Sequence, residues 1–444
     1  MFMLRFTVQN HGSFRDEAEL SLVRSSLQTS LPKNGSWEPY VASIAAIYGA
    51  NASGKSQFVD AILYFKTIIA ESATSWSTRK TLGRSHFRLD HTSGKEPSTY
   101  VMDFLHNGVR HEYGFSVTRD AVIEEWLYSY PTGRKRILFE RNGHDLNFGR
   151  ALGGGEALLR QALGQRELVL SKGRVVGNDQ LGDLCSAIVD GIDVAKFGES
   201  DRFTRLQSLI EEVTTGDFRI EDLRTMLKVA DVGIAGAQVK VNERHPKELR
   251  VLRAVFEAVQ ESEISEEELD KIAAEAARVL LFEHIGADHD IYSLPSDLQS
   301  TGTLTWLSLA APAISAMRRG TLFVVDELDA SLHPQLAQVM IRMFADPETN
   351  PRRAQLIFTT HDTYFLSPTS ELNISPEEVF FVEKGRDGAS SIFSLADFPH
   401  RSDHNYSRRY LQGRYGAVPA VAPAFLASLI ERNAIPEAAT GERG

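Results

Sequence analysis

The sequence contains almost no cysteine: among its 444 residues, only Cys185 is one. A single thiol has no partner for an intrachain disulfide, and it cannot build a metal site from several thiolates. Cysteine use this low fits a reducing compartment, so we expect a cytoplasmic protein without a disulfide framework.

Long hydrophobic runs are also absent. The longest apolar stretch covers residues 41–48, whereas a membrane-spanning helix needs about 20 apolar residues. The first residues, MFMLRFTVQNH, lack the apolar core of a signal peptide. We therefore expect no membrane association unless a partner provides it.

The chain has no excess of positive charge. It carries 48 basic and 59 acidic residues, a formal net charge of −11, which excludes a general nucleic-acid coat but leaves a local basic patch open. Apolar residues make up 42% and charged residues 24%, as in ordinary globular proteins. Sustained heptads are missing, so a long coiled-coil arm is not expected.

Alternating and continuous apolar patterns are present instead. Leu4 to Val8 and Ala18 to Leu22 alternate with polar residues, which predicts an opening hairpin. The apolar run at 41–48 predicts a buried strand, and the spacing of apolar residues over 58–69 predicts a helix after it. Between that strand and that helix lies a glycine-bounded loop.

The rest of the chain changes character several times. Short β-rich runs with Asn107-Gly108 and Asn142-Gly143 between them predict an antiparallel sheet. Helical patterns follow, clearest at 206–213, 249–259 and 266–281, and α/β alternation resumes from about residue 300 with a late hairpin over 379–395. We therefore divide the chain into a first part of an α/β core (1–97), an antiparallel β-lobe (98–150), a helical lobe (151–290), a second part of the core (291–432) and a flexible tail (433–444).

The loop Gly49-Ala-Asn-Ala-Ser-Gly-Lys-Ser56 has the pattern of a phosphate-binding loop. Glycines are needed there because backbone N–H groups must close around phosphate oxygens. Lys55 would bridge the β- and γ-phosphates, and the Ser56 hydroxyl would bind Mg²⁺. An ordinary glycine turn is the alternative, but the flanking strand and helix favour the phosphate loop. The predicted nucleotide-binding residues are Gly49, Asn51, Gly54, Lys55, Ser56 and Gln57.

Two further apolar strands end in polar residues. Leu322 to Val325 leads into Asp326, a predicted magnesium ligand, and Glu327, a base that would polarise the attacking water. The strand at 356–358 leads into His361, which we expect to contact the γ-phosphate or orient that water. Acidic residues and histidines at strand ends are often merely structural, but the phosphate loop upstream favours the catalytic interpretation for both.

In this arrangement the chain resembles the ATP-binding-cassette ATPases of the SMC/RecF/OLD class, in particular the abortive-infection (AbiLi, RloA-like) branch. Gln299-Ser-Thr-Gly-Thr303 is similar to the signature segment of that class. A helix N-cap at Ser300 or Thr303 is the alternative, and the resemblance favours the signature. Asp329-Ala-Ser-Leu-His-Pro334 is similar to its D-loop, with Ser331 and His333 at the positions that act there. The resemblance covers most of the chain and is weakest in the helical middle.

The resemblance implies an α/β fold: an ABC-type P-loop NTPase head with a mixed central sheet, an antiparallel β-lobe and a helical insertion. It also implies ATP and Mg²⁺ as cofactors and a homodimer, or a higher even oligomer, in which Ser300 and Gly302 reach the γ-phosphate held by the other subunit. Such a clamp would regulate a separate effector, a nuclease or toxin, in anti-phage defence. The roughly eighty residues after His361 are too few for the nuclease domain that OLD proteins carry.

Two other functions stay open: a DNA-repair ATPase of the RecF kind and the nucleotide-binding subunit of a transporter. His333 stands where transporter subunits have an aspartate, which argues against the transporter function. The arginines and tyrosines over 401–415 suit either nucleic-acid binding or a packed terminal segment.

Two departures from the family pattern concern the site. His11-Gly12 replaces the Phe-Arg pair of the usual N-F-R-S-F opening, which removes a basic group unless Arg5 or Arg15 substitutes for it. No glutamine can be assigned to the Q-loop.

Overall fold

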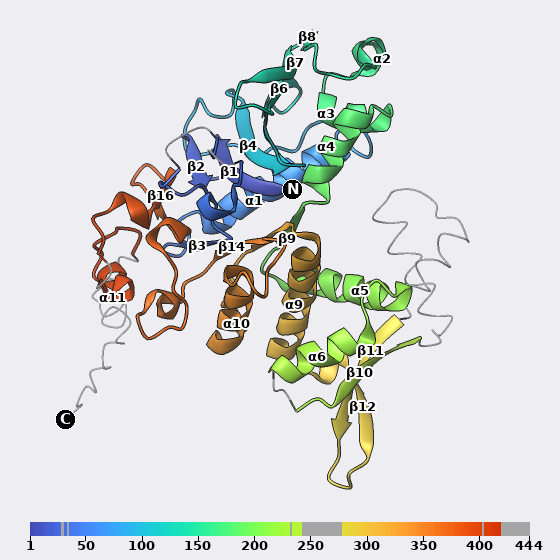
Figure 1. Ribbon diagram of the computed structural model, residues 1–444, viewed down its shortest axis with the longest axis vertical. Helices are drawn as coiled ribbons and strands as arrows, with labels where there is room; N and C mark the ends of the chain where they lie inside the picture. Colours follow the sequence, from blue (N-terminus) through green and yellow to red (C-terminus); the bar gives the residue numbers. More distant parts are fainter. Residues whose placement is uncertain (28–30, 33–34, 231–232, 242–277, 402–403, 419–444) are drawn as a thin grey trace, which may run out of the picture.

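The structure, a computed structural model, describes residues 1–27, 31–32, 35–230, 233–241, 278–401 and 404–418 (Figure 1). Its helices are α1 (Lys55–Glu71), α2 (Glu156–Ala162), α3 (Val169–Val175), α4 (Asp179–Val189), α5 (Glu199–Thr215), α6 (Ile220–Ala230), α9 (Thr301–Arg319), α10 (Pro334–Ala345) and α11 (Tyr406–Leu411). Short 3₁₀ turns are η1 (Glu38–Tyr40), η2 (Ser296–Leu298), η3 (Thr363–Leu366), η4 (Pro376–Glu378) and η5 (Leu395–Asp397). None of the helices in this part of the chain is long and apolar enough to cross a bilayer.

A mixed six-stranded sheet forms the centre of the molecule. Its order is β16 (Ser390–Ser394), β15 (Val379–Lys384), β3 (Ile44–Tyr48), β14 (Gln355–Thr359), β13 (Leu322–Val325) and β9 (Ile192–Ala195). All neighbours are parallel except β15 and β16, which form the predicted late hairpin. The strands predicted from the apolar runs are confirmed as β3, β13 and β14, and β14 pairs with β13.

The central sheet is buried on both faces, which is why its strands are continuously apolar. Along β3, Ala45 and Ile47 pack with α1 and the antiparallel sheet, while Ile44, Ala46 and Tyr48 pack with the helices of the other face. In Figure 1, α9 and α10 lie below the central sheet and the antiparallel sheet lies above it. The two hydrophobic clusters therefore share the central sheet as a common layer.

The antiparallel sheet has seven strands. Their order is β2 (Ala18–Ser21), β1 (Phe2–Gln9), β4 (Ser98–His106), β5 (Val109–Val117), β6 (Val122–Tyr130), β7 (Arg136–Asn142) and β8 (Asp145–Phe148). The opening hairpin and both asparagine-glycine hairpins are confirmed. The sheet also takes in β1 and β2, because β1 pairs along its length with β4, so it is not limited to residues 98–150.

The helical interpretation of residues 151–290 needs correction in two places. β9 is a strand of the central sheet, held beside β13 by parallel pairing. A separate three-stranded sheet contains β10 (Gly236–Val241), β11 (Arg278–Ile285) and β12 (Ile291–Pro295). Residues 278–281, predicted as the end of a helix, begin β11, because Leu280 and Phe282 alternate into the core. The predicted helix 249–259, most of 266–281 and the tail from 433 lie outside the described residues.

Candidate nucleotide site

The loop between β3 and α1 is shaped by close contacts at its glycines. A Cβ on Gly49 would lie 2.4 Å from the carbonyl oxygen of Val382, and one on Gly54 would lie 2.6 Å from the hydroxyls of Ser13 and Ser390. Gly54 also has a φ of +120°, which side chains rarely adopt. The sequence pattern therefore corresponds to real steric limits at both ends of the loop.

Lys55, the first residue of α1, holds a positive charge over the loop. The side chain is buried, and its Nζ donates to the carbonyl oxygens of Gly49 (2.9 Å) and Ala50 (3.2 Å). Burial lowers the pKa of Lys55, while the nearby carboxylates of Glu327, Asp326 and Asp329 act to raise it. The ammonium group thus lies within electrostatic reach of the acidic residues that follow β13.

The two carboxylates after β13 are oriented by a threonine on the neighbouring strand. The Thr359 hydroxyl donates to Asp326 Oδ1 (2.7 Å) and accepts from the backbone N–H of Glu327 (2.7 Å). Glu327 has a φ of +55°, a left-handed conformation that costs a non-glycine residue energy and occurs often at functional sites. Burial and Asp326 raise the pKa of Glu327, which favours a role in proton transfer. Thr359 was not among the predicted site residues.

His361 follows β14 on the same edge of the sheet. Its backbone N–H donates to Asp329 Oδ2 (3.2 Å). Burial and the positive charge of Lys55 lower the pKa of the imidazole, so His361 is mainly neutral near pH 7. A neutral ring can accept or donate one hydrogen bond toward a phosphate or a water molecule.

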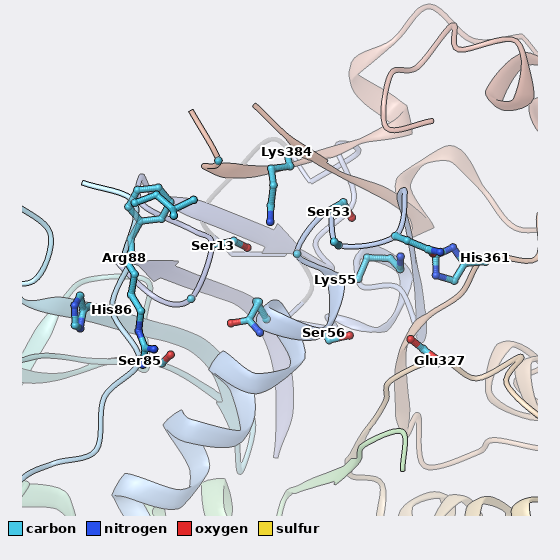
Figure 2. Close-up of a pocket in the computed structure, with 18 residues that line it drawn as sticks. Ser13, Ser53, Lys55, Ser56, Ser85, His86, Arg88, Glu327, His361 and Lys384 are labelled. Carbon is cyan, nitrogen blue, oxygen red and sulfur yellow. The ribbon is translucent and has the colours of Figure 1, made fainter. Parts of the chain in front are cut away.

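These groups face one cavity of about 800 Å³, shown in Figure 2. Seven of the predicted site residues line it: Asn51, Gly54, Lys55, Ser56, Gln57, Glu327 and His361. Gly49 lies behind the loop, against the backbone of β15. Asp326 does not line this cavity; it lines a smaller one of about 230 Å³ together with Glu327.

The signature-like and D-loop-like residues lie apart from the main cavity. Ser300 is the N-cap of α9, its Oγ accepting from the N–H of Thr303 (3.1 Å), so the capping interpretation holds. Gly302 approaches the backbone of Ser331, which lines the smaller cavity. His333 caps α10 through its Nδ1. The cavity that contains Lys55 is lined by none of the predicted signature and D-loop residues, which are Ser300, Gly302, Ser331 and His333.

Neither Arg5 nor Arg15 takes the place of the arginine that the His11-Gly12 departure removes. His11 is fully buried, with its Nδ1 2.8 Å from the Tyr100 hydroxyl. Arg15 pairs with Asp16 and Asp387, and neither Arg5 nor Arg15 lines the cavity. Arg88 and Lys384 also line the cavity, although neither was among the site residues predicted from the sequence. Lys384 has no local sequence signal that could have identified it.

The protein donors suit a magnesium ion that arrives with a nucleotide. In the described part of the chain, no group of three or more histidine, cysteine, aspartate or glutamate side chains could hold a metal. The candidate donors are the Ser56 hydroxyl, which lines the main cavity, and the Asp326 carboxylate, which lines the smaller cavity beside Glu327. Mg²⁺ in nucleotide sites commonly takes one or two protein oxygens and completes its shell with phosphate oxygens and water, which fits this pair.

The C-terminal tyrosines form part of the core. Tyr410 and Tyr415 stack on Phe381 of β15, with ring centroids 5.2 and 5.5 Å apart, and both are buried. The packed-segment interpretation is therefore confirmed for these residues. Arg408 and Arg414 lie exposed beside them.

Comparison with known proteins gave three findings. One similar solved structure is titled "Crystal structure of the SmcHead bound to the C-winged helix domain of ScpA", with 13% identity, 89% of this chain and 97% of that chain covered, and a TM-score of 0.43. No curated protein matches the sequence. The sequence profile of the family described as "AAA domain, putative AbiEii toxin, Type IV TA system" matches residues 44–150 and 200–367. Since these segments make up more than half of the residues, the chain belongs to this family of AAA-type ATPases.

Proposed function

We propose that the chain binds ATP with Mg²⁺ and hydrolyses it. The observation that carries this proposal is the convergence of Lys55, Ser56, Glu327 and His361 on one cavity, with Asp326 held beside it. Lys55 would neutralise the β- and γ-phosphates, Glu327 would accept a proton from the attacking water, and His361 would orient that water. Mg²⁺, held by Ser56 and Asp326, would offset the charge that develops on the phosphate oxygens.

Steady-state hydrolysis by the purified chain tests this assignment. Lys55→Ala is expected to abolish nucleotide binding, whereas Glu327→Gln should keep binding and lose about 100-fold or more of kcat, as expected for a base that acts only in the chemical step. Glu348→Gln, an exposed control on the loop after α10, should behave as wild type. Unchanged hydrolysis in Glu327→Gln would contradict the assignment.

We further propose that two copies close over two ATP molecules. Ser300 and Gly302 support this because they lie outside the cavity of their own chain, so a contact with the γ-phosphate would require the other subunit. Ser300 Oγ already caps α9, and the N-terminus of this 19-residue helix favours an anion. The γ-phosphate would be the contact that distinguishes the closed state from the open one.

The biological role we propose is control of a separate effector in anti-phage, abortive-infection defence. The family description supports it by naming a toxin of a toxin–antitoxin system. A Glu327→Gln bait, compared with Lys55→Ala, should retain the product of a neighbouring gene only when ATP is present, and that product's nuclease or toxic activity should change on binding. Nucleic-acid cleavage by the purified chain alone would contradict a separate effector. Strong stimulation of hydrolysis by DNA would favour the DNA-repair alternative.

A further inference from the structure

Besides Lys55 and Arg88, the main cavity has a third basic side chain, Lys384, at the end of β15. β15 runs parallel to β3, with Phe381 opposite Tyr48, so Lys384 lies level with the phosphate loop. Figure 2 shows its side chain reaching into the cavity near Ser13, on the opposite side of Lys55 from Glu327 and His361. The topology therefore brings a lysine from late in the sequence to the nucleotide cavity.

Hydrogen bonds hold this hairpin against the phosphate loop. The Ser390 hydroxyl, on β16 directly opposite Lys384, donates to the carbonyl oxygen of Ser53 (2.5 Å) and forms a second hydrogen bond with the hydroxyl of Ser13 (2.8 Å). The backbone N–H of Ser390 also donates to the Ser13 carbonyl oxygen (2.7 Å). Because the strand pair is fixed at the loop, the lysine stem starts from a defined position.

The ammonium group of Lys384 has no hydrogen-bond or ion-pair partner among the described residues. Glu327 is the one acidic residue among those that line the cavity, and it lies near Lys55. A charged amine that faces a cavity without a nearby carboxylate favours an anionic ligand. The part of the cavity around Lys384 is thus suited to phosphate.

Position 12 cannot easily provide this charge. Gly12 has a φ of +56°, and a Cβ there would lie 2.1 Å from Oε1 of Gln57. A longer side chain would have to displace Gln57, itself a residue of the cavity. The two observations agree with each other: position 12 has no room for a long basic side chain, and Lys384 of β15 supplies a positive charge to the same cavity.

We propose that Lys384 is a second phosphate-binding residue, which contacts the nucleotide on its α-phosphate side while Lys55 serves the β- and γ-phosphates. This inference rests on the proposed nucleotide binding. An α-phosphate is present in both ATP and ADP and is not the group transferred. Lys384 therefore stabilises ground state and transition state alike, and its loss raises KM much more than it lowers kcat.

The test compares Lys384→Ala and Lys384→Arg with Arg386→Ala, a matched control in the exposed turn of the same hairpin. Equilibrium titrations use ATPγS and ADP, and steady-state ATPase assays accompany them. Lys384→Ala should weaken binding of both nucleotides by about 10- to 100-fold, the range for a lost charge-assisted hydrogen bond. Lys384→Arg should recover most of that affinity, and Arg386→Ala should match wild type.

Two results would overturn the inference: wild-type affinity in Lys384→Ala, or a loss confined to ATPγS, which would place the lysine at the γ-phosphate. Lys55→Ala separates this failure from failure of the proposed function. If Lys55→Ala loses binding and Lys384→Ala does not, only the role of Lys384 is wrong. If Lys55→Ala binds nucleotide as tightly as wild type, the site assignment itself is wrong.

Discussion

Replacing Thr359 by valine would test how the two carboxylates are held in place. Valine keeps the branched shape but removes the hydroxyl that bonds Asp326 and the backbone N–H of Glu327, each at 2.7 Å. Thr359 is fully buried, so water cannot easily take over these bonds. A hydrogen bond to a charged group contributes about 1.5 to 3 kcal/mol, and we expect the free energy of unfolding to fall by about 2 to 3 kcal/mol.

Thr359→Val should also slow hydrolysis, because the Thr359 hydroxyl would no longer hold the two carboxylate residues in position. A displacement of about 1 Å at a reacting group can cost on the order of 100-fold. We expect kcat of Thr359→Val to fall roughly 10- to 100-fold, with a KM close to wild type, in steady-state assays below the unfolding transition. Urea denaturation measures the stability change separately.

Two controls isolate the hydroxyl. Thr359→Ser keeps it and should retain kcat to within a few-fold. Thr360→Val removes a hydroxyl that accepts only from the backbone N–H of Asp362 among the described residues (3.0 Å) and should leave both carboxylates in place. If Thr359→Val hydrolyses ATP at the wild-type rate, or if Thr359→Ser is equally impaired, the hydroxyl does not position the carboxylates.

Three further predictions concern pH and stability. Burial and the adjacent aspartate raise the pKa of Glu327. Because a general base must be ionised, kcat should fall as the pH decreases, with a midpoint above the usual pKa of a glutamate. A midpoint near pH 4 would contradict this prediction. Glu125 is fully buried and accepts from one tyrosine hydroxyl and two backbone N–H groups, so Glu125→Ala should lower the free energy of unfolding by about 2 to 4 kcal/mol in urea titrations. Arg205 Nε donates to the carbonyl oxygen of Ser308 (3.1 Å), the acceptor left open because Pro312 inside α9 has no N–H. Arg205→Met should therefore cost about 1 to 2 kcal/mol, and adding Pro312→Ala should restore part of it.

The sequence was sufficient where a local pattern decides the structure. The apolar runs that became β3, β13 and β14 are buried on both faces, so their composition shows directly in the sequence. The pattern of the glycine loop is equally local, because its glycines, lysine and serine fall within eight residues, even though atoms of distant residues crowd Gly49 and Gly54. Asn107-Gly108 predicted its hairpin for the same reason.

Non-local pairing explains most of what the sequence did not show. β9 has four residues with Asp193 among them, and it becomes a strand of the central sheet only because β13 pairs with it. Lys384 reaches the cavity through the pairing of β15 with β3, about 330 residues earlier in the chain. Thr359 resembles any β-branched strand residue until β13 places two carboxylates beside it.

The assembly state of Glu327→Gln in the presence of ATP and Mg²⁺ is the most direct test of the central claim. The variant should bind ATP without hydrolysing it, so analytical ultracentrifugation should show a particle of twice the chain mass with ATP and not with ADP. Adding Ser300→Arg, which places a bulky cation at the start of α9, should return the protein to monomer. A Glu327→Gln protein that binds ATP and sediments as a monomer at every concentration would contradict the two-subunit clamp.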